Sequence, residues 1–162
     1  HLSRGLGCLN TILSLYPESE RLHAVCMQDE FGWTALHWAA WSGVPDCIKL
    51  ILSHYPETER LHVVSTPDND GWTVLHCAAR SGNLETIETI LTLYPESERL
   101  PALGATTSHG NNVLHLVANS NNIESIKAVL SIYPESERHQ VLNEQNERGN
   151  TVLDVMNEET RR

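Results

Sequence analysis

The hydrophobic and polar residues of this chain follow a pattern that returns at a constant interval. In one copy, Leu84, Ile87, Ile90 and Leu91 have the i, i+3, i+6, i+7 spacing of a helix that packs on one side. The same stripe occurs one interval earlier and one later, at Ile48, Ile51, Leu52 and at Ile123, Ile126, Val129, Leu130. A helix with a single apolar stripe cannot bury that stripe alone. The pattern therefore predicts stacked units, each of which buries its apolar stripe against its neighbours.

A shorter helix precedes the striped helix in each unit. Thr34 and Thr73 stand where a helix N-cap is expected, and Gly43 and Gly82 suit the left-handed conformation that ends a helix. The alanines between them are small enough to let a neighbouring helix approach closely. Each unit is therefore predicted to contain a helical hairpin.

A block of sequence Tyr-Pro-Glu-Ser/Thr-Glu-Arg follows the striped helix. It begins at Tyr16, Tyr55, Tyr94 and Tyr133, so the period is 39 residues. Proline suits the first helical position and acidic residues suit the positive end of the helix dipole, which favours a short third helix in each unit. The alternative is an extended loop. In register, these blocks would form an acidic ridge in which one unit's arginine approaches the next unit's glutamate, although recent duplication explains their sameness equally well.

The segments 29–43 and 68–82 resemble the ankyrin repeat. They meet the family pattern D-x-x-G-x-T-P-L-H-x-A-A-x-x-G, with Ala35 and Val74 in place of the proline. The third copy is weaker and keeps only Gly110, Leu114, His115 and Ala118. The family unit has about 33 residues, and the additional residues here fall in the Tyr-Pro block.

The resemblance implies an all-α fold, an ankyrin-type solenoid of helical hairpins, here with a short third helix in each repeat. We expect a single domain over 1–162, with a partial unit at 1–29, full units at 30–68, 69–107 and 108–146, and a half-unit at 147–162. The polar end from Asn157 to Arg162 is expected to cap the stack. The start at His1 suggests a truncated or processed piece, which would expose apolar surface there.

Composition narrows the classes of partner. The 162 residues are 40% hydrophobic, which indicates a globular chain, and 11 Lys+Arg against 21 Asp+Glu give a net charge of −10. Binding to nucleic acid or to an anionic membrane surface needs clustered Lys and Arg, so neither is expected. No apolar run approaches the length of a membrane span.

The four cysteines, Cys8, Cys26, Cys47 and Cys77, form no C-x-x-C pair and no zinc-binding spacing. Residues one period apart are too distant for a disulfide, so we expect reduced, mostly buried thiols and a cytoplasmic, reducing compartment. His37, His76 and His115 share one repeat position, roughly 8–10 Å apart, so they cannot hold one zinc ion. The resemblance implies that they tie the turns by hydrogen bonds.

No recognisable catalytic motif is present: there is no Gly-rich phosphate loop, H-E-x-x-H or G-x-S-x-G, and a nucleophilic pair of His76 and Cys77 is disfavoured because adjacent helix residues diverge. We therefore expect no enzyme activity, no cofactor, no metal and no small-molecule substrate.

The family resemblance implies that a protein partner is bound by the turn tips and the exposed side of each first helix. The candidate binding residues are Phe31, Trp33, Trp41, Asp70, Trp72, Arg80, His109, Asn111 and Asn119. The last half-unit adds Glu147, Arg148 and Asn150 to this face. Trp33 and Trp72 have an alternative role in bracing adjacent units, and Trp38 is expected in the core between repeats.

The sequence therefore predicts a non-enzymatic protein-interaction module that binds a protein on its concave turn face. The alternative is the targeting module of a larger enzyme, or of a secreted effector of an intracellular bacterium that acts in the host cytosol, since the near-identical blocks resemble such arrays. A purely structural spacer is the third possibility.

Overall fold

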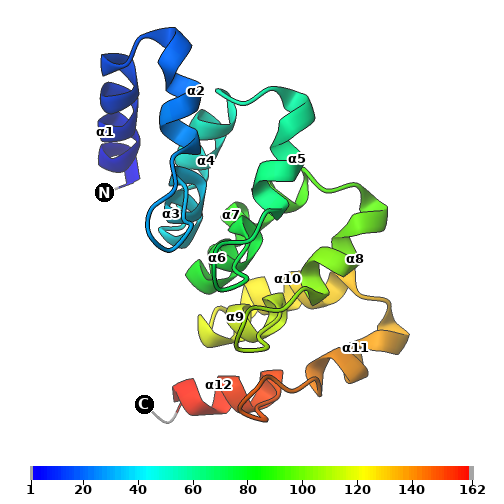
Figure 1. The fold of residues 1–162 in the computed structure, drawn as a ribbon. Helices are drawn as coiled ribbons and strands as arrows, with labels where there is room; N and C mark the ends of the chain where they lie inside the picture. Colours follow the sequence, from blue (N-terminus) through cyan, green and yellow to red (C-terminus); the bar gives the residue numbers. More distant parts are fainter. Residues whose placement is uncertain (1, 161–162) are drawn as a thin grey trace.

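The computed structural model describes residues 2–160, with side chains for 5–156, and in this part of the chain all regular secondary structure is helical. Twelve helices are stacked in one direction from α1 to α12 (Figure 1). The first helices of the units are α3 (Ala35–Trp41), α6 (Val74–Ser81), α9 (Val113–Asn119) and α12 (Val152–Thr160). The second helices are α1 (Leu2–Leu15), α4 (Pro45–Leu52), α7 (Leu84–Leu91) and α10 (Ile123–Ile132).

A third helix is present after each second helix, as the Tyr-Pro block predicts. These helices are α2 (Glu18–Cys26), α5 (Glu57–Ser65), α8 (Glu96–Gly104) and α11 (Glu135–Leu142). Each begins directly after the proline of the block, with two glutamates in its first turn. The prediction of a helical solenoid with three helices in each unit is confirmed.

The Tyr-Pro block holds the units together rather than forming an ion-pair ridge. The hydroxyls of Tyr55 and Tyr94 donate to the carbonyls of Val25 and Val64 in the third helix of the preceding unit, at 3.3 and 3.4 Å. Each block arginine donates from Nε to the carbonyl of its own block tyrosine, at 3.0–3.2 Å. No ion pair joins a block arginine to a glutamate among the described side chains. The expected approach of one unit's arginine to the next unit's glutamate is therefore wrong, and the tyrosines and arginines of the block bind backbone carbonyls instead.

The first helices begin with the predicted caps. Thr34, Thr73 and Asn112 each form a capping box with the histidine three residues later. Gly43 and Gly82 follow the helices with φ of +68° and +70°, and Asn121 takes the same left-handed conformation in the third unit with φ of +58°. Asparagine tolerates this conformation better than other side chains, which explains its place there.

The striped helices bury most of the predicted apolar residues. Ile48, Ile51, Ile87 and Ile90 are at most 1% exposed. Ile123 is an exception: it is 59% exposed at the first position of α10, so its assignment to the buried stripe is wrong. In the first helix of the chain, Leu13 is buried but Ile12 is 54% exposed, because none of the described helices packs beside α1 as α3 packs beside α4.

The thiols follow the prediction only in part. All four cysteines are free, and Cys47 and Cys77 are buried, but Cys8 and Cys26 are exposed. Burial raises the pKa of the Cys77 thiol. Cys8 lies on α1 one period before the buried Cys47, and Cys26 lies at the end of α2, at a repeat position that is also exposed in Ser65 and Gly104. No helix in the described range combines the length and apolar character needed to cross a membrane.

Candidate functional site

Three of the four turns that precede the first helices are held by one side chain each, that of Asp29, Asp68 or Asn146. The Asp29 carboxylate accepts from the backbone N–H groups of Phe31 and Trp33 at 3.0 and 2.9 Å. Asp68 binds the N–H groups of Asp70 and Trp72 in the same way, both at 2.8 Å. These bonds fix the direction of the residue at each turn tip.

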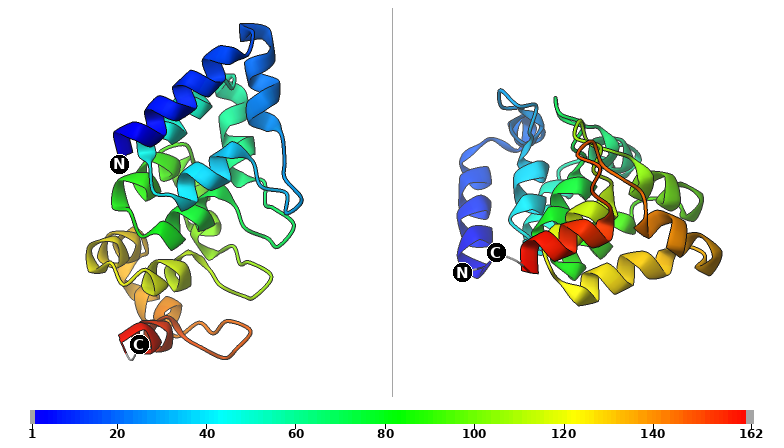
Figure 2. Two further views of the ribbon diagram at one scale, coloured as in Figure 1. Left: turned by 90° about the vertical axis from the view of Figure 1, so that its left-hand side faces the viewer. Right: turned by 90° about the horizontal axis from the view of Figure 1, so that it is seen from below.

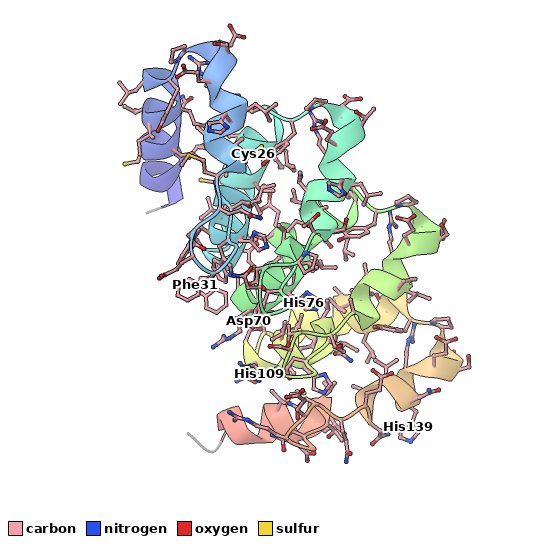
Figure 3. The ribbon with its side chains drawn as sticks, viewed as in Figure 1. Cys26, Phe31, Asp70, His76, His109 and His139 are labelled. Atoms are coloured by element: carbon pink, nitrogen blue, oxygen red, sulfur yellow. The ribbon has the colours of Figure 1, made fainter. Side chains whose placement is uncertain are left out.

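Neighbouring turns are joined by backbone hydrogen bonds. The N–H groups of Asn69, Ser108 and Glu147 donate to the carbonyls of Phe31, Asp70 and His109 at 3.1, 2.8 and 3.0 Å. The four turns therefore project side by side along the stack (Figure 2). Phe31, Asp70 and His109 follow one another in a row, one in each unit (Figure 3). We call the surface formed by these tips and the exposed sides of α3, α6 and α9 the turn face.

The glycines of the turns permit this close stacking. Gly32, Gly71 and Gly110 have φ of +82°, +79° and +74°, and a Cβ atom on Gly110 would lie 2.9 Å from the backbone nitrogen of Glu147. Each glycine thus lies against the next turn, as the periodic alignment of these residues requires.

Four tryptophans meet at the N-terminal end of the turn face. The ring of Trp33 is central, with its centroid 4.6 Å from that of Trp38 and 5.5 Å from that of Trp41. Trp41 in turn lies 5.7 Å from Trp72. With Phe31 at the turn tip, these rings form what we call the aromatic patch.

Trp38 belongs to this patch and not to the core. It is 52% exposed, and its indole N–H donates to Asp29 at 3.3 Å. The expectation that it packs between repeats is wrong, because the side chain lies over Trp33 on the outer side of α3 and leaves the buried positions to Leu36, Ala39 and Ala40.

Exposure divides the aromatic patch into two groups. Phe31, Trp38 and Trp41 are 55, 52 and 40% exposed, whereas Trp33 and Trp72 are only partly exposed. The indole N–H of Trp33 also donates to the carboxylate of Asp68 in the next unit. Trp33 therefore braces two units, and Trp41, Trp38 and Phe31 offer the accessible surface.

The buried histidines tie the turns along the stack. In His37, His76 and His115, Nδ1 accepts the N–H of the helix N-cap residue at 3.2, 3.1 and 3.3 Å. Their Nε2 atoms lie 3.1, 2.8 and 3.0 Å from the carbonyl oxygens of Trp72, Ala105 and Glu144. Trp72 belongs to the following unit, whereas Ala105 and Glu144 follow the third helix of the histidine's own unit. Each imidazole is thus neutral with the proton on Nε2, and burial lowers the pKa of all three.

The side-chain ladder that links the turns is interrupted at Thr107. Between the first and second turns, Trp33 donates to Asp68, and between the third and fourth, Asn146 donates to Asn111 at 2.9 Å. Thr107 has the same repeat position as Asp68 and Asn146, and would be the partner of Trp72. Its buried hydroxyl has no hydrogen-bond partner. A threonine side chain is too short to cap its turn as Asp29 and Asp68 cap theirs.

We expect Thr107→Asp to raise the free energy of unfolding by about 1 kcal/mol, because its carboxylate would accept from the N–H groups of His109 and Asn111. Urea denaturation measures the change. Thr107→Val is the control: it removes the lone hydroxyl at constant shape and should leave stability unchanged or slightly raised. Marked destabilisation by Thr107→Val would show that the hydroxyl has a partner after all.

At the other end of the turn face, four of the candidate binding residues line one pocket of about 260 Å³: Arg80, His109, Asn111 and Asn119. Arg148 and Asn150, which the sequence also places on this face, complete the polar lining together with His115 and Asn146. Leu116 and Val155 supply the apolar lining. We call this cavity the polar pocket. Asn146 was missed by sequence reasoning, although it shares the repeat position of Asp29 and Asp68.

Asp70 stands apart from both groups: it is exposed at its turn tip, between the aromatic patch and the polar pocket. A smaller cavity of about 160 Å³, lined by Cys26, His37, Tyr55 and His62 among others, lies on the side of the third helices. Among the side chains of residues 5–156, no cluster of three or more His, Cys, Asp or Glu is placed to hold a metal ion.

Comparison with known proteins agrees with this architecture. A family model described as ankyrin repeats, in three copies, matches residues 3–100, which is more than half of the chain. No curated protein matches the chain.

Proposed function

From the premise that this chain belongs to the ankyrin repeat family, whose repeats are generally protein–protein interaction modules, we propose that it is a non-enzymatic module that binds a protein partner on its turn face. The partner inserts an apolar or aromatic side chain against the exposed part of the aromatic patch.

The exposure of Phe31, Trp38 and Trp41 is the observation that carries this proposal. Large aromatic side chains are expensive to leave in water and are enriched at the centres of protein interfaces. The core packing of α3 does not depend on these three side chains, because its inner side is filled by Leu36, Ala39 and Ala40.

The rigidity of the turn face supports the same proposal. Phe31 lies on a turn that is fixed by the Asp29 side chain, and its carbonyl accepts a hydrogen bond from the backbone N–H of Asn69 in the next turn. Trp41 is held between Trp33 and Trp72, with the Arg80 guanidinium 5.7 Å from its ring centre. A surface fixed in advance loses little conformational entropy when a partner binds.

The test is affinity capture with mass spectrometry, run with the native chain and with Trp38→Ala/Trp41→Ala. We expect the native chain to recover a partner that the double variant loses. With that partner purified, the double variant should weaken binding by about 30-fold or more, since truncating a central aromatic residue costs about 2 kcal/mol or more.

Ile123→Ala is the matched control, because Ile123 is 59% exposed on α10, away from the turn face. It should retain the partner. Circular dichroism should show that the double variant is folded at the temperature of the capture, since neither side chain belongs to the buried core. A partner bound equally by the double variant would refute the assignment of the aromatic patch.

A further inference from the structure

The turns beside the aromatic patch carry an excess of negative charge. The first two turns together contain four carboxylates, those of Asp29, Glu30, Asp68 and Asp70. The first helices that follow these turns, α3 and α6, contain one arginine and no lysine, and that arginine, Arg80, lies over the ring of Trp41. The third turn has no carboxylate, and in the fourth turn the one glutamate is followed by an arginine. The negative charge of the turn face is therefore greatest at its aromatic end.

The four carboxylates differ in how far the fold already uses them. Asp29 and Asp68 accept hydrogen bonds from the backbone of their own turns and from an indole N–H group. Glu30 and Asp70 contribute only backbone groups to the contacts between the turns. Their side chains are exposed, and within the described part of the chain neither carboxylate has a hydrogen bond or an ion pair.

Phe31 has both of these carboxylates as neighbours. Glu30 precedes it in its own turn, and Asp70 holds the same tip position in the next turn. The two turns are joined at this point by the hydrogen bond from the Asn69 N–H to the Phe31 carbonyl, and Phe31 and Asp70 lie next to each other in the row of tips (Figure 3). The ring of Phe31 is exposed, and none of the ring contacts in the described range involves it.

An exposed aromatic ring beside two carboxylates without partners suits a guanidinium group. A guanidinium lies flat against an aromatic face, while the N–H groups in its plane donate to carboxylates at the side. A neutral apolar side chain would use the ring alone, and it would take water from the two carboxylates without replacing the lost hydrogen bonds. The ring and the charges together therefore favour a cation over an apolar residue at this position.

We propose that the partner segment bound on the turn face is basic, and that one of its arginines lies over Phe31 with its guanidinium directed to Glu30 and Asp70. This inference deepens the proposed function, on which it rests, because it gives the charge of the partner. The apolar residue of the segment occupies the exposed rings of Trp38 and Trp41, and the arginine occupies the neighbouring turn tips. The net charge of −10 also speeds the encounter with a basic partner.

The test uses N-acetyl-arginine N-methylamide, titrated into the full ¹⁵N-labelled chain and followed by NMR. We expect saturable shifts of the Phe31 and Asp70 amides at millimolar concentration. The corresponding citrulline compound has nearly the same shape without the charge, and it should bind about five-fold more weakly or less. Raising the ionic strength to about 0.5 M should weaken the binding of the arginine compound several-fold, because salt screens the attraction.

Three variants separate the turn tips from the overall charge. Glu30→Gln/Asp70→Asn should weaken binding of the arginine compound about three-fold or more, because both carboxylates are lost. Glu88→Gln/Glu124→Gln makes the same charge change on α7 and α10, away from the turn face, and should leave the affinity unchanged. Phe31→Leu keeps an apolar side chain without the aromatic face, and should weaken binding about two-fold or more. All five positions are exposed, so the variants should fold.

Three results would overturn the proposal: no saturable response to the arginine compound, an equal response to the citrulline compound, or an unchanged affinity in Glu30→Gln/Asp70→Asn. A captured partner that is lost by Trp38→Ala/Trp41→Ala but fully retained by Glu30→Gln/Asp70→Asn would also overturn it, and would leave the proposed function in place. The titrations need no captured partner, so a failure to capture one counts against the proposed function alone.

Discussion

Acidification from about pH 7 to pH 5 should sharply lower the free energy of unfolding of this chain. The cause is the set His37, His76 and His115, which are 3, 1 and 2% exposed. The loss should approach about 1.4 kcal/mol per pH unit for each histidine that stays neutral in the folded chain, or about 4 kcal/mol per pH unit for all three.

The sign follows from the hydrogen bonds. Nδ1 of each histidine faces a backbone N–H donor, so a proton on Nδ1 would break the cap and face another donor. Burial thus lowers the pKa of each imidazole from 6.5 in the folded chain, while the unfolded chain takes up the proton near 6.5. The stabilisation is complete above pH 6.5 and decreases as the pH falls toward the folded pKa values.

Urea denaturation at several pH values measures this dependence. His76→Gln should reduce the slope of the unfolding free energy against pH by up to about 1.4 kcal/mol per pH unit, the contribution of one histidine. It should also lower stability at neutral pH. His139→Gln, at an exposed position on α11, should leave both slope and stability unchanged. Asp154 replaces histidine in the last unit, and hydrogen bonds from Thr151 lower its pKa. The stabilisation that its carboxylate contributes is therefore lost only below about pH 4, outside the range from pH 7 to pH 5. A flat profile between pH 7 and pH 5 would contradict the assignment.

The fold was largely predictable because each structural requirement repeats. Caps at Thr34 and Thr73, left-handed glycines at Gly43 and Gly82, and prolines before the third helices all recur in phase, so each repeat confirms the interpretation of the others. The bonding of the Tyr-Pro block could not be predicted. Sequence spacing shows that arginine lies near tyrosine along the helix, but it cannot show that Nε turns back to the tyrosine carbonyl instead of meeting a glutamate.

The candidate site was predictable by position but not by side-chain orientation. The repeat position predicts that Trp41 and Arg80 share one face, and the structure places Arg80 over the Trp41 ring. Trp38 was assigned wrongly because its repeat position holds a small or apolar residue, Cys77 or Leu116, in the next units, where it is buried. In the first full unit Trp38 instead turns outward onto Trp33.

Replacing Ala79 with leucine should destabilise the chain by at least about 3 kcal/mol. Ala40, Ala79 and Ala118 share one repeat position and are fully buried, and α3, α6 and α9 pack along this line. Ala79 therefore has a neighbouring first helix on each side, with no free volume for a larger side chain. Overpacking of a core costs about 1–3 kcal/mol at one contact, and here two helix contacts must open together.

Ala105→Leu provides the matched control, since it makes the same chemical change at an exposed position and should alter stability by no more than about 0.5 kcal/mol. In a stack where each unit contacts only its neighbours, Ala79→Leu should also divide the single unfolding transition into two, because it weakens the central junction on both sides. Thermal denaturation followed by circular dichroism and by tryptophan fluorescence separates these events: all four tryptophans lie in the first two full units, so fluorescence reports only on that half. Coincident transitions with unchanged midpoint would mean that the first helices do not pack on Ala79.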